Sequence, residues 1–131
     1  MSNRKATSLE TTLEVRDSCL CLHLQRAARA AARRFDRAFR ALGLTNGQFS
    51  LLMALNRPEP ALIGPLAALL AMDRTTLTAA LKPLVRRGLV EINVDLVDRR
   101  GRRLRLTSAG QTLLAEALPV WRREHRALEA R

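Results

Sequence analysis

Side chains that can bind an anionic polymer form two groups in this 131-residue chain. Hydroxyl, guanidinium and ammonium groups donate hydrogen bonds to phosphate oxygens and to base edges. The first group follows Asp73 and consists of Arg74, Thr75, Thr76, Thr78 and Lys82. The second consists of Asp98, Arg99, Arg100 and Arg102, in a segment, residues 95–105, whose five arginines and two aspartates give a net charge of +3. The two groups predict contact with nucleic acid, and a solvated charged surface without function is the alternative.

Residues 73–88 have the pattern of a helix that would carry the first group. Asp73 is a suitable N-cap residue, and Gly88 can take the left-handed conformation that ends a helix. Four apolar residues recur at helical spacing and make one stripe: Leu77, Leu81, Leu84 and Val85. Pro83 removes a backbone donor, so we expect a local bend there rather than a break. The polar residues of the first group are left on the solvent side of this helix.

Residues 90–106 have the pattern of a β-hairpin that would carry the second group. Apolar residues alternate with polar ones in two short stretches, which are Val90, Ile92 and Val94, then Leu104 and Leu106. Such alternation is typical of half-buried strands, and Gly101 between them suits a turn that other residues resist. A helix that can enter a groove, followed by a hairpin with a basic tip, is the layout of a winged helix-turn-helix. The negative potential of a minor groove attracts arginines of this kind.

These segments resemble the multiple antibiotic resistance regulator (MarR) family of bacterial transcription factors. The resemblance is carried by DRTTLTAALKPLVRRGLV, by Asp98-Arg99-Arg100 after Asp95, by LTSAG and, upstream, by LTNGQFSLLMAL. It covers nearly the whole chain. It implies a single, mainly α domain over residues 1–131, with a small β-hairpin wing and long N- and C-terminal helices that form a dimerisation layer. It also implies a homodimeric repressor that binds a palindromic site in double-stranded DNA.

The resemblance further implies roles for single residues and a class of ligand. In the family the wing aspartate braces an arginine two residues on, which enters the minor groove, and Asp98 and Arg100 match these positions. Ala79 stands where the family often has a basic residue, so one contact with DNA is missing. The ligand implied is a small aromatic acid or a phenol, bound between the dimer helices and the DNA-binding lobe.

The DNA-binding lobe is expected over residues 45–107. Thr45 and Gln48 have the spacing of a capping box, which starts a helix that would bury Phe49, Leu52 and either Leu51 or Leu55. Pro65 suits the first turn of the next helix, because its missing N–H group costs nothing there. Four residues of this helix are predicted to pack inward: Leu66, Leu69, Leu70 and Met72.

Two long helices are predicted outside the lobe, over residues 17–42 and 108–130, while residues 1 to about 12 are expected to be loose. In the first helix, Leu20 and Leu24 begin an apolar rhythm, and arginines occupy the opposite side. The second helix would be capped by Thr107 or Ser108, and its heptad seam consists of Leu114, Leu118, Trp121, His125 and Leu128. This seam could pack on the first helix of the same chain. Its place outside the lobe and the family resemblance favour a two-fold dimer.

Composition narrows the classes of partner. The formal net charge of +11 implies an anionic partner, with nucleic acid preferred over a membrane. The chain has no tyrosine, which argues against binding single strands by stacking. Its longest apolar run is too short to span a bilayer, and the N-terminus lacks the hydrophobic core of a signal peptide. We therefore expect a bacterial cytoplasmic protein associated with the nucleoid.

No catalytic motif and no cofactor site is found in the sequence. Cys19 and His23 are four residues apart, but zinc needs three or four ligands and His125 would have to supply another. Cys21 lies in a segment that resembles the hydroperoxide-sensing branch of the family, although Gln25 stands where that branch has a tyrosine. Cys21 is thus either a redox switch or a small apolar residue of the dimer layer. A peroxide-sensing regulator and a chromosome-coating protein without sequence preference are the alternatives to a ligand-responsive repressor.

Overall fold

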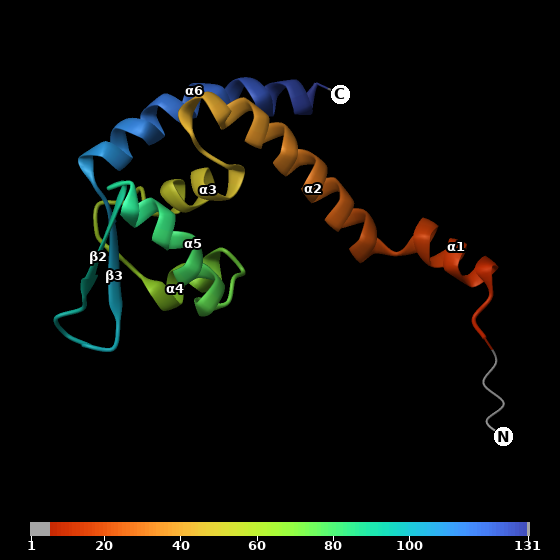
Figure 1. Ribbon diagram of the computed structural model, residues 1–131, viewed down its shortest axis with the longest axis horizontal. Coiled ribbons are helices and arrows are strands. Elements are labelled where there is room, and N and C mark those ends of the chain that lie inside the picture. Colours follow the sequence, from red (N-terminus) through yellow and green to blue (C-terminus); the bar gives the residue numbers. More distant parts are fainter. Residues whose placement is uncertain (1–5, 131) are drawn as a thin grey trace. The chain divides into compact units, whose positions relative to one another are not determined.

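The computed structural model describes residues 6–130 and divides into two compact units. We call residues 6–34 the N-terminal unit and residues 35–130 the C-terminal unit. The elements are α1 (Leu9–Ser18), α2 (Leu20–Phe39), η1 (Arg40–Leu42), α3 (Asn46–Ala54), β1 (Ala61–Leu62), α4 (Ile63–Leu69), α5 (Arg74–Arg86), β2 (Val90–Val94), β3 (Arg102–Leu106) and α6 (Ser108–Glu129). The first unit holds α1 and most of α2, and the second holds everything that follows (Figure 1).

The N-terminal unit corrects the prediction of one helix from Asp17 onward. Ser8 caps α1 by accepting a hydrogen bond from the backbone N–H of Thr11. Cys19 then has an extended backbone, with ψ at 107°, which separates α1 from α2. Residues 9–12 are therefore helical and not loose, while residues 1–5 lie outside the described range. The cap at Ser8 was the sequence signal for this helix, and the polar composition of the segment obscured it.

The end of α2 belongs to the C-terminal unit and is fixed to the lobe. Phe35 and Phe39 are buried, and the helix gives way to η1, which ends at Gly43 with a left-handed φ of 68°. Oδ1 of Asp36 accepts a hydrogen bond of 2.6 Å from the backbone N–H of Asn46, at the start of α3. Nη1 of Arg87 donates to the carbonyl of Gly43 at 2.7 Å. The predicted end at Leu42 is thus the end of η1, and α2 itself stops at Phe39.

The predicted capping box of α3 is confirmed. Thr45 accepts from the backbone N–H of Gln48, and the Gln48 side chain accepts from the backbone N–H of Thr45, both at 3.1 Å. The helix buries more than the expected set, because Leu51 and Leu55 are both buried along with Phe49 and Leu52. It therefore lies at the centre of the lobe, where α5 and α6 both contact it.

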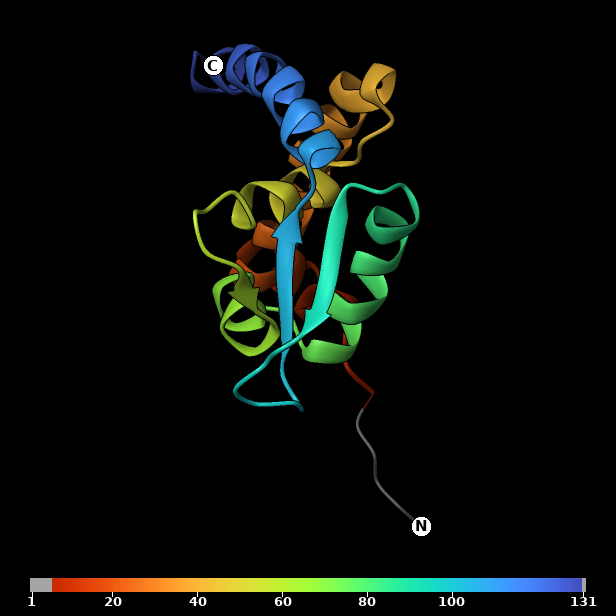
Figure 2. The same ribbon diagram turned by 90° about the vertical axis from the view of Figure 1, so that its left-hand side faces the viewer.

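The wing is part of a three-stranded antiparallel sheet with the order β1-β3-β2, one strand more than predicted. The short β1 pairs with β3 through Ala61↔Leu104, and β2 pairs with β3 from Val90↔Leu106 to Val94↔Arg102. Leu104 and Leu106 are buried, as expected of one face. Ile92 and Val94 are 38% and 49% exposed, so the apolar face of β2 is fully covered at Val90 and only partly covered toward the tip. The loop between β2 and β3 extends past the ends of α4 and α5 (Figure 2).

The helix-turn-helix is formed by α4 and α5. Leu66 is buried, and Leu70 and Met72 pack partly against the core, but Leu69 is 65% exposed and its predicted inward packing is wrong. The turn places Ala71 at a φ of 53°, in the left-handed region. Asp73 caps α5 as predicted, and the helix continues through Pro83 to Arg86. Leu77, Leu81 and Leu84 are fully buried, whereas Val85, at the edge of the apolar stripe, is 39% exposed.

The start of α6 is held against the end of α5. Thr107 is its N-cap and accepts from the backbone N–H of Gly110 at 3.0 Å, so of the two predicted caps Thr107 is used and Ser108 is the first helical residue. The Thr107 hydroxyl also donates to the carbonyl of Gly88 at 2.6 Å. Gly110 is buried against the carbonyl of Leu89, where a Cβ atom would overlap it. This close approach lets α6 leave the sheet directly above the lobe.

The seam of α6 is not outside the core, contrary to the prediction. Leu114 and Ala117 are buried, and Trp121 and Leu128 pack partly on the core of the same chain. Four aromatic rings join the helices, with centroids 4.8 Å apart for Phe39 and Phe49, 6.5 Å for Phe49 and Trp121, and 4.6 Å for Trp121 and His125. One side of α6 is therefore committed to its own lobe.

Candidate nucleic-acid interface

Helix α5 presents the first predicted group to solvent. All five of its residues are exposed, whereas the opposite side of the helix is fully buried. At about 100° per residue, Thr75 and Lys82 lie on the side directly opposite the buried leucines. Ala79 and Arg86 share that side and are also exposed. Arg86 was missed as a candidate contact, although its spacing from Thr75 and Lys82 is the signal that could have found it.

Arg74 lies against α4 rather than standing free in solvent. A Cβ atom at Gly64 would come within 2.7 Å of Nη2 of Arg74, so the guanidinium covers the glycine. Because Gly64 has no side chain, the guanidinium can rest on the first turn of α4. Arg74 is therefore positioned by two helices before any partner arrives.

Thr76 belongs to the helix cap in this structure. Its backbone N–H donates to Oδ1 of Asp73 at 2.7 Å, and its hydroxyl donates to Oδ2 at 2.8 Å. The backbone hydrogen bond from Thr76, followed by the one from its side chain, lowers the pKa of Asp73 below its ordinary value. Since the Thr76 hydroxyl already has an acceptor, Thr75 and Thr78 are better placed than Thr76 to contact a base.

The wing tip is an ordered loop with short internal hydrogen bonds. The backbone N–H of Asp95 donates to the carbonyl of Gly101 at 3.1 Å, and that of Gly101 donates to the carbonyl of Asp98 at 2.8 Å. Gly101 does not have a positive φ, contrary to the expected role. A Cβ atom at this position would lie 3.2 Å from the Asp98 carbonyl oxygen, so a side chain there would crowd the turn. Nη1 of Arg102 donates to the carbonyls of Arg99 and Gly101, both at 3.2 Å. Arg102 therefore closes the loop, and Arg99 and Arg100 are left exposed.

The contact between Asp98 and Arg100 differs from the one that the family resemblance implied. Oδ1 of Asp98 accepts from the backbone N–H of Arg100 at 3.1 Å. This bond orders the turn that carries Arg100, whereas a brace would hold its guanidinium. Asp98 thus acts on the backbone path of the wing.

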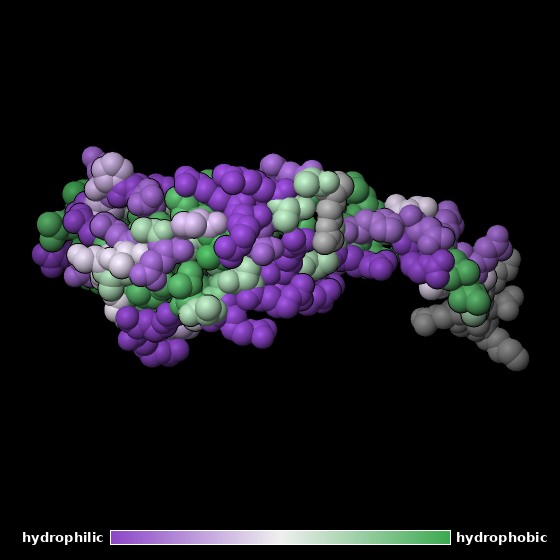
Figure 3. Space-filling model, turned by 90° about the horizontal axis from the view of Figure 1, so that it is seen from above, coloured by the Kyte–Doolittle hydropathy of each residue, from purple (hydrophilic) through white to green (hydrophobic). Residues whose placement is uncertain are grey.

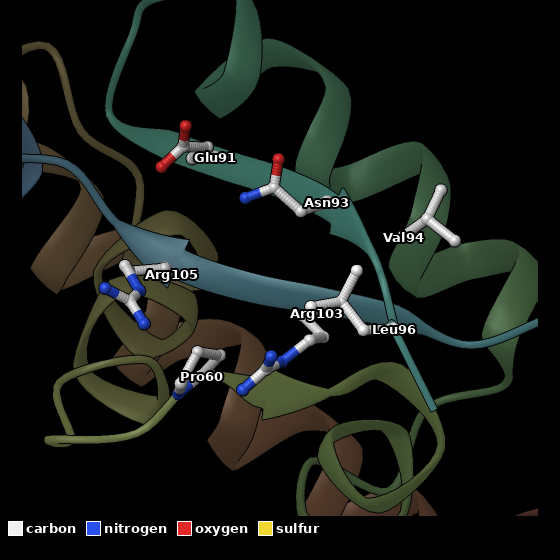
Figure 4. A pocket seen from close by; sticks show the side chains of 7 residues that line it. All are labelled: Pro60, Glu91, Asn93, Val94, Leu96, Arg103 and Arg105. Atoms are coloured by element: carbon white, nitrogen blue, oxygen red, sulfur yellow. The ribbon is translucent and has the colours of Figure 1, made fainter. Parts of the chain in front are cut away.

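The outer face of the sheet was not predicted as a site and carries four polar side chains. In the ladder, Glu91 pairs with Arg105 and Asn93 pairs with Arg103. Figure 4 shows these residues around a hollow that Pro60 and Leu96 also line. Both arginine side chains extend toward Pro60, away from β2 (Figure 4). The positively charged surface of the wing therefore extends from its tip onto the outer face of the sheet, through Arg103 and Arg105.

A second hollow lies between α3 and α6, within the C-terminal unit. Its lining consists of Phe49, Ser50, Met53, Ala54, Leu118 and Trp121. Its walls are mostly aromatic and aliphatic, and Ser50 adds a hydroxyl group. A small apolar or aromatic molecule is the class of ligand that such walls suit.

The predicted dimerisation residues fall into two sets. Leu20 and Leu24 are 71% and 60% exposed on α2, and Figure 3 shows further hydrophobic side chains at the surface of α1. In α6, Leu114 is buried and the other predicted residues are partly buried, namely Leu118, Trp121, His125 and Leu128. Nδ1 of His125 lies 3.1 Å from Oε1 of Glu129. The first set is free to meet another surface, and the second is shared with the lobe.

The prediction placed both cysteines on one helix, over residues 17–42, but the structure does not. Cys19 stands between α1 and α2, and Cys21 is exposed in the first turn of α2. Nε2 of Gln25 lies 3.5 Å from Sγ of Cys21. Nε2 of His23 is 2.8 Å from the carbonyl of Asp17, and so does not turn toward a thiol. Among residues 6–130 no group of three metal-binding side chains is placed to hold an ion, and no helix is long and apolar enough to cross a membrane.

Known proteins match both the sequence and the fold. The sequence model of the MarR family matches residues 42–101. The transcriptional activatory protein BadR of Rhodopseudomonas palustris is 38% identical over 78 residues, which are 57% of this chain and 45% of BadR. The match therefore spans less than half the length of that curated relative.

Two solved structures of transcriptional regulators are similar over most of their length. The M. tuberculosis regulator MosR, solved in complex with DNA, is 38% identical with a TM-score of 0.80, over 86% of this chain and 82% of MosR. The transcriptional repressor CouR, bound to a 23-mer DNA duplex, is 28% identical with a TM-score of 0.76, over 96% of this chain and 87% of CouR. All of these relatives regulate transcription, and none is an enzyme.

Proposed function

Because the chain belongs to the MarR family of transcriptional regulators, we propose that it binds a palindromic site in duplex DNA as a homodimer and represses transcription. One observation carries the proposal: α5 exposes Arg74, Thr75, Thr78 and Lys82 on the same unit that carries an ordered, arginine-tipped wing. A helix of this kind fits a major groove, and the wing fits the adjacent minor groove. MosR and CouR were both solved with DNA, which supports the same partner here.

Helix α5 is proposed to read bases while the wing anchors the protein. Replacing Arg74 or Thr75 with alanine should change the relative affinity for different operators, since a good bidentate base contact is worth about 1–3 kcal/mol. Lys82→Ala is the control, because a phosphate contact is lost equally on all sequences. Equal weakening on every duplex by all three variants would remove base reading from α5. The duplexes are best obtained by selection from a random-sequence pool.

The wing gives a second test of the proposal. Arg100→Ala should weaken binding and reduce the salt slope by about 0.9 for each wing of the dimer, the value for one phosphate. Asp98→Ala removes a negative charge, so charge alone predicts tighter binding. The hydrogen bond that the Asp98 carboxylate accepts from the backbone N–H of Arg100 predicts weaker specific binding instead, because without it the turn loses its order. Tighter binding of the specific site by Asp98→Ala would reduce the wing to a basic patch.

The dimer is proposed to use the exposed leucines of α2 together with the free side of α6. Leu20 and Leu24 lie on the apolar side of the amphipathic helix α2, where they are 71% and 60% exposed. Sedimentation of the wild type against a Leu20→Ser/Leu24→Ser variant measures their part in assembly. A variant that remains dimeric would place the interface elsewhere.

A small aromatic or phenolic ligand is proposed to control DNA binding from the hollow beside Trp121. The lining residues favour an uncharged aromatic ring. Titrating phenols and aromatic acids while observing Trp121 fluorescence tests this, because Trp121 is the one tryptophan in the chain. Quenching that is absent from a Ser50→Leu variant, together with release of DNA, is the expected result.

Two alternatives are separated by simple experiments. In the redox alternative, oxidation of the exposed Cys21 thiol releases DNA. DNA binding is measured before and after mild hydroperoxide. Release of the operator by wild type, but not by Cys21→Ser, would favour the redox alternative. In the chromosome-coating alternative, specific and random duplexes bind equally at every salt concentration. A preference for the selected site in 0.15 M salt supports the regulator.

A further inference from the structure

We propose that the wing tip is an apolar wedge, formed by Leu96 and Val97, that enters the minor groove and deforms the duplex. The proposal deepens the proposed function and rests on it, because it names what the hairpin does to the bound DNA. Proteins that bind the minor groove insert side chains such as Leu, Ile or Met between base steps, and this kinks or widens the duplex. The negative potential of a narrow minor groove also attracts arginines.

The exposure of the two side chains is the first argument. Leu96 is 86% exposed and Val97 is 96% exposed, the highest values among the exposed large hydrophobic residues that the structure describes. The other side chains near this level, Leu9 and Leu20, lie on the N-terminal helices. Leu96 and Val97 instead stand on a charged loop, between Asp95 and Asp98. Their position on a projecting loop suits insertion into a partner (Figure 2).

The order of the loop is the second argument. Oδ1 of Asp95 accepts from the backbone N–H of Val97 at 3.3 Å, and the backbone N–H of Asp95 donates to Gly101. Arg102 closes the other side of the loop through two carbonyls. A loop that is ordered before binding loses less entropy when it docks. It can therefore press two apolar side chains against a duplex.

The distribution of charge names the partner. Arg99 and Arg100 follow the apolar pair within three residues and are exposed. Leu96 lines the hollow on the outer face of the sheet together with Arg103, so a guanidinium lies behind the wedge as well (Figure 4). Asp95 and Asp98 flank the pair in the sequence, and each accepts a hydrogen bond from a backbone N–H group of the loop. Apolar side chains with exposed guanidiniums beyond these two carboxylates fit a groove that has phosphates on both walls and base steps at its floor. The duplex is thus favoured over an uncharged protein surface.

The experiment compares wild type with a Leu96→Ser/Val97→Ser variant on a duplex selected from a random-sequence pool. Leu69→Ser is the matched control, because Leu69 is 65% exposed in the same unit and belongs to α4, outside the loop between β2 and β3. Energy transfer between dyes at the two duplex ends measures the bend. Affinity is measured on the intact duplex and on one with a mismatch at the base step under the wing, which makes unstacking easier.

Wild type and Leu69→Ser should bend the duplex and bind the mismatched one at least fivefold more tightly than the intact one. The double variant should bend it less and lose that preference. The proposal is overturned if the double variant bends the duplex as wild type does, or if it keeps the full preference for the mismatch. It is also overturned if the bend is unchanged and only wild type binds vesicles of phosphatidylserine, because the pair would then serve a lipid surface. Failure of wild type to select any duplex is a different result, and it removes the proposed function itself.

Discussion

The two units have amphipathic helices of similar composition but very different burial. In the C-terminal unit, nineteen hydrophobic residues from Phe35 to Ala117 form one buried core. In the N-terminal unit, no described residue is buried, and Leu9, Val15, Leu20 and Leu24 are all more than half exposed. An apolar stripe therefore stabilises a helix only where another element covers it. The C-terminal unit contains such elements, whereas the described helices of the N-terminal unit do not cover their own apolar side chains.

The largest expected contrast comes from shortening one leucine in each unit. Leu52 is fully buried in α3, and Leu52→Ala should lower the free energy of unfolding by about 2–5 kcal/mol. Leu24→Ala should leave it unchanged in dilute protein, because this side chain is 60% exposed. Urea unfolding at two protein concentrations, tenfold apart, measures both. At the higher concentration Leu24→Ala should become destabilising if α2 is covered by a second copy.

This pair can also break the comparison. If Leu24→Ala costs as much as Leu52→Ala at every concentration, the N-terminal unit is covered by its own chain. The contrast between the units would then disappear. For this comparison the slope of the unfolding free energy against urea concentration must be the same in wild type and in both variants. Equal slopes show that the unfolded states are alike.

A smaller effect is expected from adding one methyl group within the closely packed C-terminal unit. Gly110→Ala should destabilise by about 1–3 kcal/mol, because the Cβ atom overlaps the Leu89 carbonyl and α6 must move. Gly47→Ala is the matched control in α3, since only the Thr45 hydroxyl lies within 4 Å, at 3.9 Å. The control should be neutral or slightly stabilising. Thermal unfolding by circular dichroism checks both, and equal melting temperatures would show that α6 adjusts freely.

A weaker effect is expected at the exposed cap of α5. Asp73→Ala should destabilise less than Gly110→Ala, because it removes two hydrogen bonds from Thr76 at the surface. The folded pKa of Asp73 is lowered, so its contribution is present above the ordinary value of 3.8 and is lost as the pH falls below it. The stability difference between wild type and Asp73→Ala should therefore shrink below about pH 4. A difference that stays constant from pH 6 to pH 3 would contradict the assignment of the lowered pKa.

The smallest effect is expected in the turn between α4 and α5, and its sign is opposite. Ala71 has a φ of 53°, which costs a non-glycine residue about 1–2 kcal/mol. Glycine removes this strain but gives the unfolded chain more freedom, by about 0.5–1 kcal/mol. Ala71→Gly should therefore stabilise the C-terminal unit by up to about 1.5 kcal/mol. A lower melting temperature for this variant would show that the methyl group of Ala71 contributes packing that offsets the strain.

The sequence by itself determined the local features that depend on neighbouring residues. The capping box at Thr45, the cap at Asp73, the stops at Gly43 and Gly88, and the buried leucines of α5 all follow from short-range hydrogen bonding and helical periodicity. The family and its winged fold were also predictable, because the motifs of the helix and the wing lie within one continuous stretch.

Tertiary structure decided the features that depend on distant segments. The strand β1 has two residues and forms only because β3 offers it hydrogen bonds. The seam of α6 joined the core because Phe49 of α3 stacks with Trp121, a contact that spacing along α6 does not reveal. The sequence pattern places Thr76 and Arg74 alike on the polar side of α5. In the structure the Thr76 hydroxyl donates to Asp73, and the Arg74 guanidinium rests on Gly64. Periodicity shows which side of a helix is apolar, but the partner of each side chain is set by which elements the fold brings together.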